Sequence, residues 1–278
     1  MQIKSPKRVL NLDKPSIMGI LNVTPDSFSD GGKWNSLKNA LDHAKAMEEE
    51  GALIIDIGGE STRPGAKTVS VNEELDRVIP VVENLRKQTD LMISIDTSQV
   101  EVIKEAVKAG ADIWNDIRAL TNENAIETAA SLNIPVILMH MQGNPATMQD
   151  HPHYEDPLKE VIAFLNSRID ACLKGGIKKE NIILDPGFGF GKTVKDNYIL
   201  LDNLDKIVAL GYPVLSALSR KSMIGAACTI EDPKKRVTGS VAGALISVLK
   251  GAQMLRVHDV KETVEALNVY KAMIESRL

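Results

Sequence analysis

The stretch IMGILNVTPDSFSDGG, residues 17–32, decides how the rest of the chain is interpreted. It begins with an apolar run over residues 17–21, which has the length of a buried strand, and becomes polar at Asn22. The residues that follow are rich in Thr, Pro, Asp, Ser and Gly, which is the composition of a loop. We therefore expect a buried strand that delivers a polar loop to one of its ends.

The same change from an apolar run to a polar residue recurs along the chain. Further strands are expected over residues 53–57, 92–95, 113–114, 135–139, 181–184, 214–218 and 254–258. Helices with apolar stripes are expected between them, among them one capped by Ser36, one kinked at Pro80 and one over residues 197–210. The strands are continuous apolar runs, which is typical of parallel strands covered on both faces.

About eight strands alternating with about eight helices predict a (β/α)8 barrel, also called a TIM barrel, because that fold needs roughly 250 residues. A doubly wound open sheet is the alternative, although it would usually need fewer strands or a second domain. No linker rich in Pro or Ser interrupts the chain, so we expect one domain over residues 1–278. Residues 1–15 form a short preamble, expected to be a hairpin.

The overall composition excludes several classes of protein. The chain has 44% hydrophobic and 25% charged residues, as soluble globular proteins do, and its net charge of -4 argues against a general nucleic-acid binder. The sequence predicts neither a membrane-spanning helix nor a secretory signal peptide. The two cysteines have no CxxC spacing, so we expect reduced thiols in a cytoplasmic protein.

The polar residues at the strand ends form the candidate site, because the carboxyl ends of the strands carry the chemistry of such barrels. In chain order these residues are Asn22, Asp56, Asp96, Asn115, His140, Asp185, Ser219 with Lys221, and Arg256 with His258. A single Asp at a strand end is usually a cap, but a whole ring of polar ends is harder to explain in that way. Carboxylates and amides suit a polar heterocycle, whereas Arg63, Arg256, His258 and Lys221 suit an anionic group.

Two shorter patterns resemble known binding motifs, but neither predicts a binding site. GFGFGKT at residues 187–193 resembles a phosphate-binding loop, but Pro186 stands where that motif needs glycine. His151 and His153 have no third clustered ligand, so a zinc site is not expected and a solvated loop is favoured.

Several blocks resemble, in order, the signature blocks of bacterial dihydropteroate synthase, a family of pterin-binding barrels. They are MGILNVTPDSFSDGG, DIGGESTRPG, ISIDT, NDI, MHMQGNP, ILDPGFGFGK, SRKSMIG and RVHDVKE, and they cover the chain from Ile17 to the last helix. The resemblance implies a (β/α)8 barrel and a folate-pathway transferase. Such an enzyme joins 6-hydroxymethyl-7,8-dihydropterin diphosphate to 4-aminobenzoate, uses Mg²⁺, is a sulfonamide target and is commonly a homodimer.

The resemblance also implies a role for each matching position. The pterin would be bound by Asp96, Asn115, Asp185, Lys221 and Arg256, with Arg256 stacked on its ring. The diphosphate would be bound by Asn22, Thr62, Arg63 and His258, with Asn22 also a Mg²⁺ ligand. The aminobenzoate side would be formed by Phe28, Thr62, Pro64, Phe190, Ser219 and Ser222. Asp96, Arg63 and Lys221 are the expected catalytic residues. One departure is Ala217, where bacterial relatives often have glycine, and its methyl group would lie near the pterin floor.

In the family the C–O bond is thought to break first, which leaves a pterin methyl cation. Cations must then neutralise the departing diphosphate, and negative charge near the carbon, for which Asp96 is the candidate, would stabilise the pterin cation. Water would quench that cation, so we expect the loops at residues 23–35 and 59–71 to act as lids.

Two other functions stay open at this point. A corrinoid methyltransferase acting on methyltetrahydrofolate would use the same barrel, but its substrate carries no diphosphate that needs Arg63 and Lys221. A non-catalytic pterin-binding paralogue should have lost the charges of the two loops, yet Asn22, Thr62 and Arg63 are all present. The roles of His140, His151 and His153 cannot be assigned from the sequence.

Overall fold

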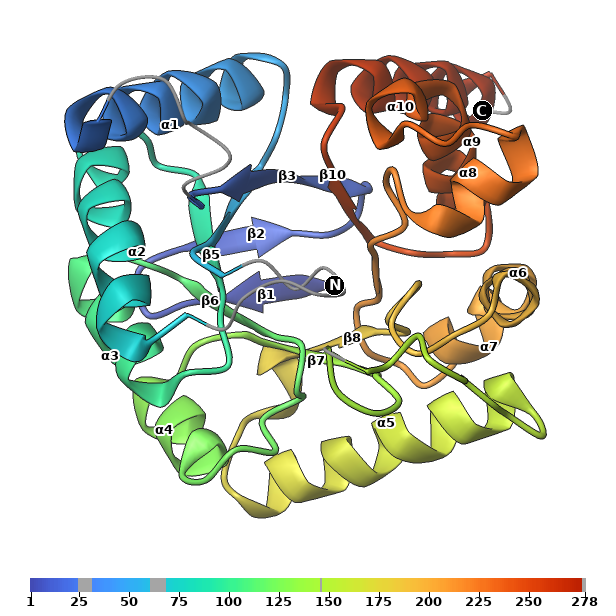
Figure 1. The fold of residues 1–278 in the computed structure, drawn as a ribbon, viewed down its shortest axis with the longest axis horizontal. Helices are drawn as coiled ribbons and strands as arrows, with labels where there is room; N and C mark the ends of the chain where they lie inside the picture. The colour runs from blue at the N-terminus through green and yellow to red at the C-terminus, as the bar shows by residue number, and fades with distance from the viewer. Residues whose placement is uncertain (25–31, 61–68, 146, 277–278) are drawn as a thin grey trace.

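The computed structural model describes residues 1–24, 32–60, 69–145 and 147–276, without the side chains of residues 32–35 (Figure 1). Its main sheet has the strands β3 (Ser16–Asn22), β4 (Ile54–Gly58), β5 (Met92–Asp96), β6 (Ile113–Asp116), β7 (Val136–Met139), β8 (Ile182–Asp185), β9 (Leu215–Ser216) and β10 (Met254–Val257). They pair in parallel in the order β8-β7-β6-β5-β4-β3-β10-β9.

A bridge between Leu184 and Val214 joins the two edges of this sheet. The amide of Leu184 donates to the carbonyl of Pro213 over 2.9 Å, so β8 and β9 meet and the sheet closes on itself. The predicted (β/α)8 barrel is therefore confirmed, and the doubly wound open sheet is wrong.

The helices form a ring around the strands (Figure 1). They are α1 (Gly32–Glu49), α2 (Val71–Arg86), α3 (Val100–Ala109), α4 (Ala125–Leu132), α5 (Pro157–Lys174), α6 (Val194–Asp202), α7 (Leu204–Val208), α8 (Ser222–Cys228), α9 (Val237–Leu249) and α10 (Val260–Glu275), with the 3-10 turns η2 (Lys179–Asn181) and η3 (Pro233–Lys235). Within the described ranges, none of these helices is both long and apolar enough to cross a lipid bilayer.

Two helix predictions differ from the structure, and one helix was not predicted. The helix expected to begin at Ser36 begins at Gly32. The helix expected over residues 197–210 is divided into α6 and α7 at Asn203, whose side-chain amide donates to the carbonyl of Ile199 over 2.9 Å. The short helix α8 was not predicted, because its seven residues are too few to show a helical period.

Helix α2 begins with a capping box, in which Ser70 accepts from the amide of Glu73 and the Glu73 side chain accepts from the amide of Ser70. It continues past Pro80 without a break. A kink at Pro80 stays a prediction.

The preamble forms the predicted hairpin, with β1 (Gln2–Lys4) antiparallel to β2 (Val9–Asn11). Figure 1 places both strands across the middle of the barrel in that view. Ile3, Leu10 and Leu12 pack against the barrel's lowest interior layer, which consists of Met18, Ile54, Met92, Ile113, Ile137, Ile183, Leu215 and Met254. The hairpin therefore closes the amino end of the barrel with apolar side chains.

The interior becomes polar one layer higher. Side chains alternate along a strand, so the residue two positions beyond each interior apolar residue also points inward. These residues include Asp56, Ser94, Asn115, Asp185 and Arg256. An apolar floor with polar groups above it therefore places the site at the carboxyl end of the strands.

Candidate active site

Arg256 joins two carboxylates at the centre of the barrel mouth. Its Nε donates to Asp56 Oδ2 over 2.6 Å, and its Nη2 donates to Asp96 Oδ2 over 2.7 Å. Asn115 Nδ2 donates to the same Asp56 oxygen over 3.2 Å. Residues from β4, β5, β6 and β10 thus meet in one network, as expected for inward positions of neighbouring strands.

Burial and charge oppose each other in this network. Burial alone would lower the pKa of Arg256, but Asp56 and Asp96 outweigh it and raise that pKa above its ordinary value, so the guanidinium is a permanent cation. Burial raises the pKa of Asp96 to about 7, against the lowering effect of Arg256. The carboxyl group of Asp96 therefore takes up a proton more readily than an exposed aspartate does, and its negative charge grows as the pH rises through about 7.

Asp185 lies at the end of β8, and its Oδ1 accepts from the amide of Gly187 over 2.7 Å. Burial raises its pKa, and the nearby Lys221 opposes that rise. Lys221 immediately precedes α8, and burial lowers its pKa to about 8, while Asp185 opposes the fall. Its ammonium donates to the carbonyl of Phe188 and lies 4.5 Å from the centre of the Phe190 ring.

Residues 186–191 form a tight turn that connects β8 to α6 through three glycines in left-handed conformations. Gly187 has φ 68°, and a Cβ there would lie 1.9 Å from the carbonyl oxygen of His140. A Cβ on Gly191, at φ 60°, would lie 2.4 Å from the carbonyl oxygen of Gln142. Glycine is required because the turn touches the neighbouring backbone directly.

The ends of β9 and β10 are joined by Ser219 and His258. Ser219 Oγ lies 3.1 Å from His258 Nδ1 and accepts from the backbone amide of His258 over 3.2 Å. One position further along each segment, Arg220 and Asp259 form an ion pair. This second link fixes the loop that carries Ser219 and Lys221 to the last strand.

Asn22 lies at the end of β3, beside Gly58 and near Asp96. A Cβ placed on Gly58 would lie 3.7 Å from Asn22 Oδ1 and 3.9 Å from Asp96 Oδ2, so two oxygen atoms flank this backbone position. Ser222 is exposed as the first residue of α8. Phe28, Thr62, Arg63 and Pro64 lie outside the described residues.

Three buried residues of the site received no role from the sequence. In the sequence Asp56 is one of the polar residues at the strand ends, with no role of its own. It lies two positions after Ile54, whose side chain is in the barrel interior, so the side chain of Asp56 also points into the barrel. Glu74 of α2 has Oε1 without a hydrogen-bond partner in the described structure, and burial raises its pKa to about 7. Lys192 donates to two carbonyls of the turn at residues 186–191, which is called the glycine turn below. In the sequence it appears only as the lysine of GFGFGKT, the pattern that does not fit a phosphate-binding loop.

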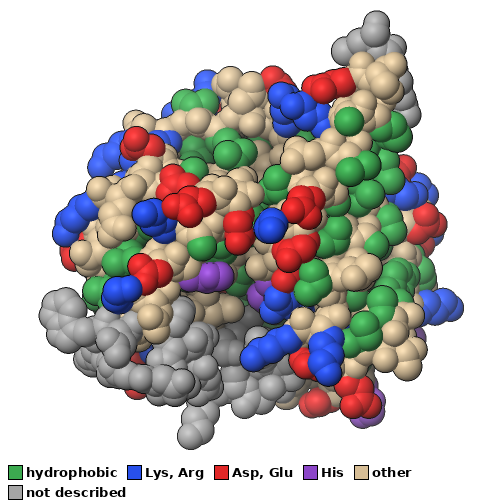
Figure 2. Space-filling view, turned by 90° about the horizontal axis from the view of Figure 1, so that it is seen from above, with side chains coloured by type: hydrophobic (Ala, Val, Ile, Leu, Met, Phe, Trp, Pro, Cys, Tyr) green, Lys and Arg blue, Asp and Glu red, His purple; other side chains and the backbone are tan. Residues whose placement is uncertain are grey.

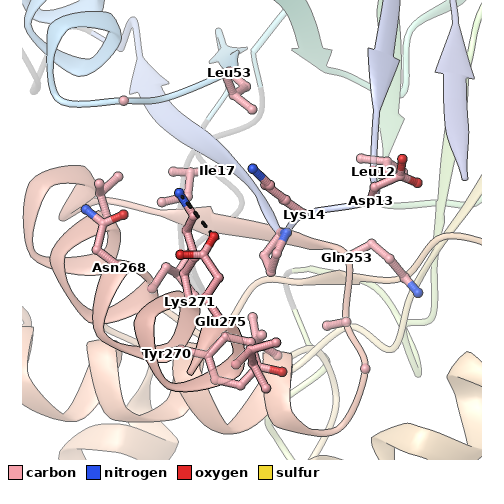
Figure 3. A pocket seen from close by; sticks show the side chains of 18 residues that line it. Leu12, Asp13, Lys14, Ile17, Leu53, Gln253, Asn268, Tyr270, Lys271 and Glu275 are labelled. Atoms are coloured by element: carbon pink, nitrogen blue, oxygen red, sulfur yellow. Dashed lines mark ion pairs between the residues drawn. The ribbon is translucent and has the colours of Figure 1, made fainter. Parts of the chain in front are cut away.

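A separate pocket of about 540 Å³ lies at the opposite end of the barrel (Figure 3). Its walls include Ile17, Leu53 and Gln253 near the starts of three strands, together with one face of α10. The lining is mostly apolar, and the ion pair between Lys271 and Glu275 is 3.7 Å long. This pocket contains none of the residues predicted for chemistry.

The comparisons with known proteins agree with the resemblance found in the sequence. Residues 18–258 match the family described as pterin binding enzyme. The dihydropteroate synthase of Haemophilus influenzae is 56% identical over 273 residues, which cover 98% of this chain and 98% of that protein. The Escherichia coli K12 dihydropteroate synthase is 53% identical over 268 residues, with 96% and 95% covered.

Solved structures are similar to this fold over nearly the whole chain. The Xanthomonas albilineans dihydropteroate synthase with 4-aminobenzoic acid has a TM-score of 0.93 and 50% identity, with 98% of this chain and 97% of that chain covered. The same enzyme in complex with 7,8-dihydropteroate has a TM-score of 0.91 and 47% identity, with 98% of each chain covered. The chain therefore belongs to the pterin binding enzyme family and, within it, to the dihydropteroate synthases.

Proposed function

We propose that the mouth of this barrel joins 6-hydroxymethyl-7,8-dihydropterin diphosphate to 4-aminobenzoate, using the residues assigned below. The observation that carries this proposal is Arg256, held between Asp56 and Asp96 in the same barrel mouth as Asn115, Asp185 and Lys221. A flat heterocycle with several N–H groups needs acceptors at its edge and a flat cation against its face. This network offers both.

Asp96, Asn115, Asp185, Lys221 and Arg256 would bind the pterin. Asp185 has one oxygen on the amide of Gly187, so its other oxygen is the one that would accept from the amino-pyrimidinone edge. Arg256 is held from behind by Asp56, which would keep the guanidinium plane in place against the ring. Relatives support this placement, since one solved structure of the family contains 7,8-dihydropteroate.

Asn22, Thr62, Arg63 and His258 would bind the diphosphate. The amide oxygen of Asn22 is a hard donor of the kind that Mg²⁺ prefers, and it lies beside Gly58, as does Asp96 Oδ2. Among the residues that the structure describes, no three Asp, Glu, His or Cys side chains are grouped so that they could hold a metal ion. We propose that substrate phosphates and water supply most of the Mg²⁺ ligands, as they do in many enzymes. When bound, Mg²⁺ would supply positive charge to the leaving group.

The aminobenzoate would lie between Phe190, the start of α8 and the loops at residues 23–35 and 59–71. Lys221 lies beside the Phe190 ring, and Ser219 and Ser222 flank it along the chain. Phe28, Thr62 and Pro64 would complete this side from the two loops. The Yersinia pestis dihydropteroate synthase has been solved with a sulfonamide drug, which supports sulfonamides as ligands of this pocket here.

In the proposed reaction the C–O bond of the pterin substrate breaks, and its electron pair leaves with the diphosphate. The negative charge of Asp96 then stabilises the pterin methyl cation, and Arg63 and Lys221 favour departure of the anion. The amine of aminobenzoate attacks the carbon, and the proton it loses goes to water or to diphosphate. Water must be excluded until attack is complete, which is the role proposed for the two loops.

Steady-state formation of dihydropteroate tests these assignments. Asp96→Asn removes the charge while keeping the shape, so turnover should fall at least tenfold, because a hydrogen bond to a charged group is worth roughly 1.5–3 kcal/mol. Lys195→Met, at an exposed position in α6, is the control and should leave turnover unchanged. Wild-type turnover in the Asp96→Asn variant would contradict the role of Asp96.

A homodimer is also proposed. Exposed apolar side chains lie on α9 and α10, where Leu249 is 58% exposed and Val269 is 72% exposed. Figure 2 shows hydrophobic side chains gathered on the right of the molecule, the side where Figure 1 places these helices. Sedimentation velocity should give about twice the chain mass, and Val269→Asp should shift the protein towards monomer. A cytoplasmic location stays a prediction.

A further inference from the structure

Lys192 is a buried lysine whose side-chain nitrogen is surrounded by backbone carbonyls. Its side chain is 3% exposed, and its ammonium donates to Gly187 O over 2.7 Å, to Phe190 O over 2.9 Å and to His140 O over 3.3 Å. An ammonium has three N–H donors, so these three acceptors satisfy all of them. Two acceptors belong to the glycine turn, and the third belongs to the residue that follows β7.

The other carbonyls of the turn are also occupied. Those of Phe188, Gly189 and Gly191 accept from the side chains of Lys221, Gln149 and Tyr154. All carbonyls of residues 187–191 therefore accept a side-chain hydrogen bond, and Lys192 takes two of the five. Lys192 directly follows the turn in the chain and bonds it from inside the protein, whereas the other three donors belong to neighbouring loops.

This support is costly for the protein. Burial lowers the pKa of Lys192 to about 7, Lys221 lowers it further, and Asp185 opposes the fall. A buried charge is seldom a gain in stability over apolar side chains of similar volume. A lysine buried at this position is therefore better explained by function than by stability. The turn that it supports contacts residues of both proposed substrate pockets, namely Asp185 and Lys221.

The turn connects the two pockets through its own ends. At one end the amide of Gly187 holds Asp185 Oδ1, and at the other end Phe190 lies beside Lys221. We propose that Lys192 is a positioning residue, which fixes this turn so that the pterin carboxylate and the aminobenzoate platform keep their relative positions. This inference rests on the roles proposed above for Asp185 and Phe190.

Loss of the support should weaken both substrates together. Lys192→Met keeps an unbranched side chain that is one atom shorter, and it removes the charge and every donor. KM for the pterin substrate and KM for aminobenzoate should each rise about tenfold or more, because three carbonyls lose a charged partner. Lys195→Met is the matched control, since this exposed lysine lies three positions later and its side chain makes no hydrogen bond or ion pair with the residues that the structure describes.

A conservative variant separates positioning from simple loss of folding. Lys192→Arg keeps the cation and its donors, so both KM values should stay closer to wild type than those of Lys192→Met. A purely structural role would lower the melting temperature and leave both KM values of the folded enzyme unchanged. Unchanged KM values in Lys192→Met, or equal impairment in Lys192→Arg and Lys192→Met, would overturn the proposal.

If Lys192→Met does not fold, Tyr154→Phe decides the question. It removes one donor from Gly191 O, where the bond is 2.8 Å, and leaves Lys192 in place. Both KM values should rise about threefold, the effect of one neutral hydrogen bond, and no change in either would overturn the proposal.

Asp185→Asn distinguishes a failure of the proposed pterin site from a failure of the role inferred for Lys192. If Asp185→Asn keeps wild-type pterin affinity, the proposed site is wrong, whereas normal Lys192 variants beside an impaired Asp185→Asn overturn only this inference.

Discussion

Asp185→Asn should weaken pterin binding strongly while leaving the backbone unchanged. In the wild-type protein Asp185 is 3% exposed and one oxygen accepts from the amide of Gly187 over 2.7 Å. An asparagine has only one oxygen for two sets of donors. If its oxygen faces Gly187, its NH₂ group faces the pterin donors, and if the amide turns over, that NH₂ group faces the amide of Gly187. Either way a donor meets a donor in a buried site.

The size of the effect follows from these two orientations. Losing a hydrogen bond to a charged acceptor costs roughly 1.5–3 kcal/mol, and leaving a buried donor unsatisfied costs roughly 1–3 kcal/mol more. The lower ends of these two ranges add to about 2.5 kcal/mol, so the affinity should fall by at least about fiftyfold. Isothermal titration calorimetry with the pterin alone measures it without the second substrate.

Asp112→Asn is the matched control for this experiment. Asp112 is a carboxylate that is just as buried, at 1% exposed, but it lies at the amino end of the barrel. There it accepts from Arg86 Nη2 over 2.6 Å and from the amide of Ile93 over 3.1 Å. Asp112→Asn should lower the melting temperature and leave pterin affinity unchanged. Equal pterin affinity in Asp185→Asn and wild type, or equal losses in both variants, would refute the reasoning.

Four further predictions test other parts of the account. Arg63→Ala should lower turnover about ten- to a hundredfold with an unchanged melting temperature, because it removes charge compensation for the diphosphate; unaltered turnover would remove Arg63 from the site. A sulfonamide should bind measurably in calorimetry only when pterin diphosphate, or pterin with diphosphate and Mg²⁺, is present, and tight binding to the apo protein would show a preformed pocket. Turnover should fall as pH drops through about 7, because Asp96 gains a proton and loses its charge; the pH profile of Asp96→Asn should lack this limb, and its persistence would assign it to another group. Ile3→Ala should lower the free energy of unfolding by about 2–4 kcal/mol in urea titrations, because Ile3 is fully buried at the amino end of the barrel. KM should not change, and a raised KM would show that packing at the amino end affects substrate binding.

The strands of the barrel were predictable because each is a local apolar run with a polar end. The hairpin over residues 1–15 was also expected, and the structure confirms it. The break at Asn203 was not predictable, since apolar residues continue on both sides of it. Helix α8 was missed because seven residues cannot show a helical period.

The site was predictable in part. Asp96, Asn115, Asp185 and Arg256 stand at or near strand ends, where a barrel places its chemistry, and the structure brings them together. Lys192 could not be found in this way, because its partners come from His140 as well as from its own turn. A buried lysine is recognised only once the surrounding carbonyls are known.

Direct measurement of product tests the central claim, which is that this barrel mouth makes dihydropteroate. The purified chain is incubated with 6-hydroxymethyl-7,8-dihydropterin diphosphate and 4-aminobenzoate, with and without Mg²⁺, and both products are quantified. We predict 7,8-dihydropteroate and diphosphate in equal amounts, with a strong dependence on Mg²⁺. Absence of dihydropteroate from folded protein that still binds the pterin would contradict the account and favour a non-catalytic pterin-binding protein.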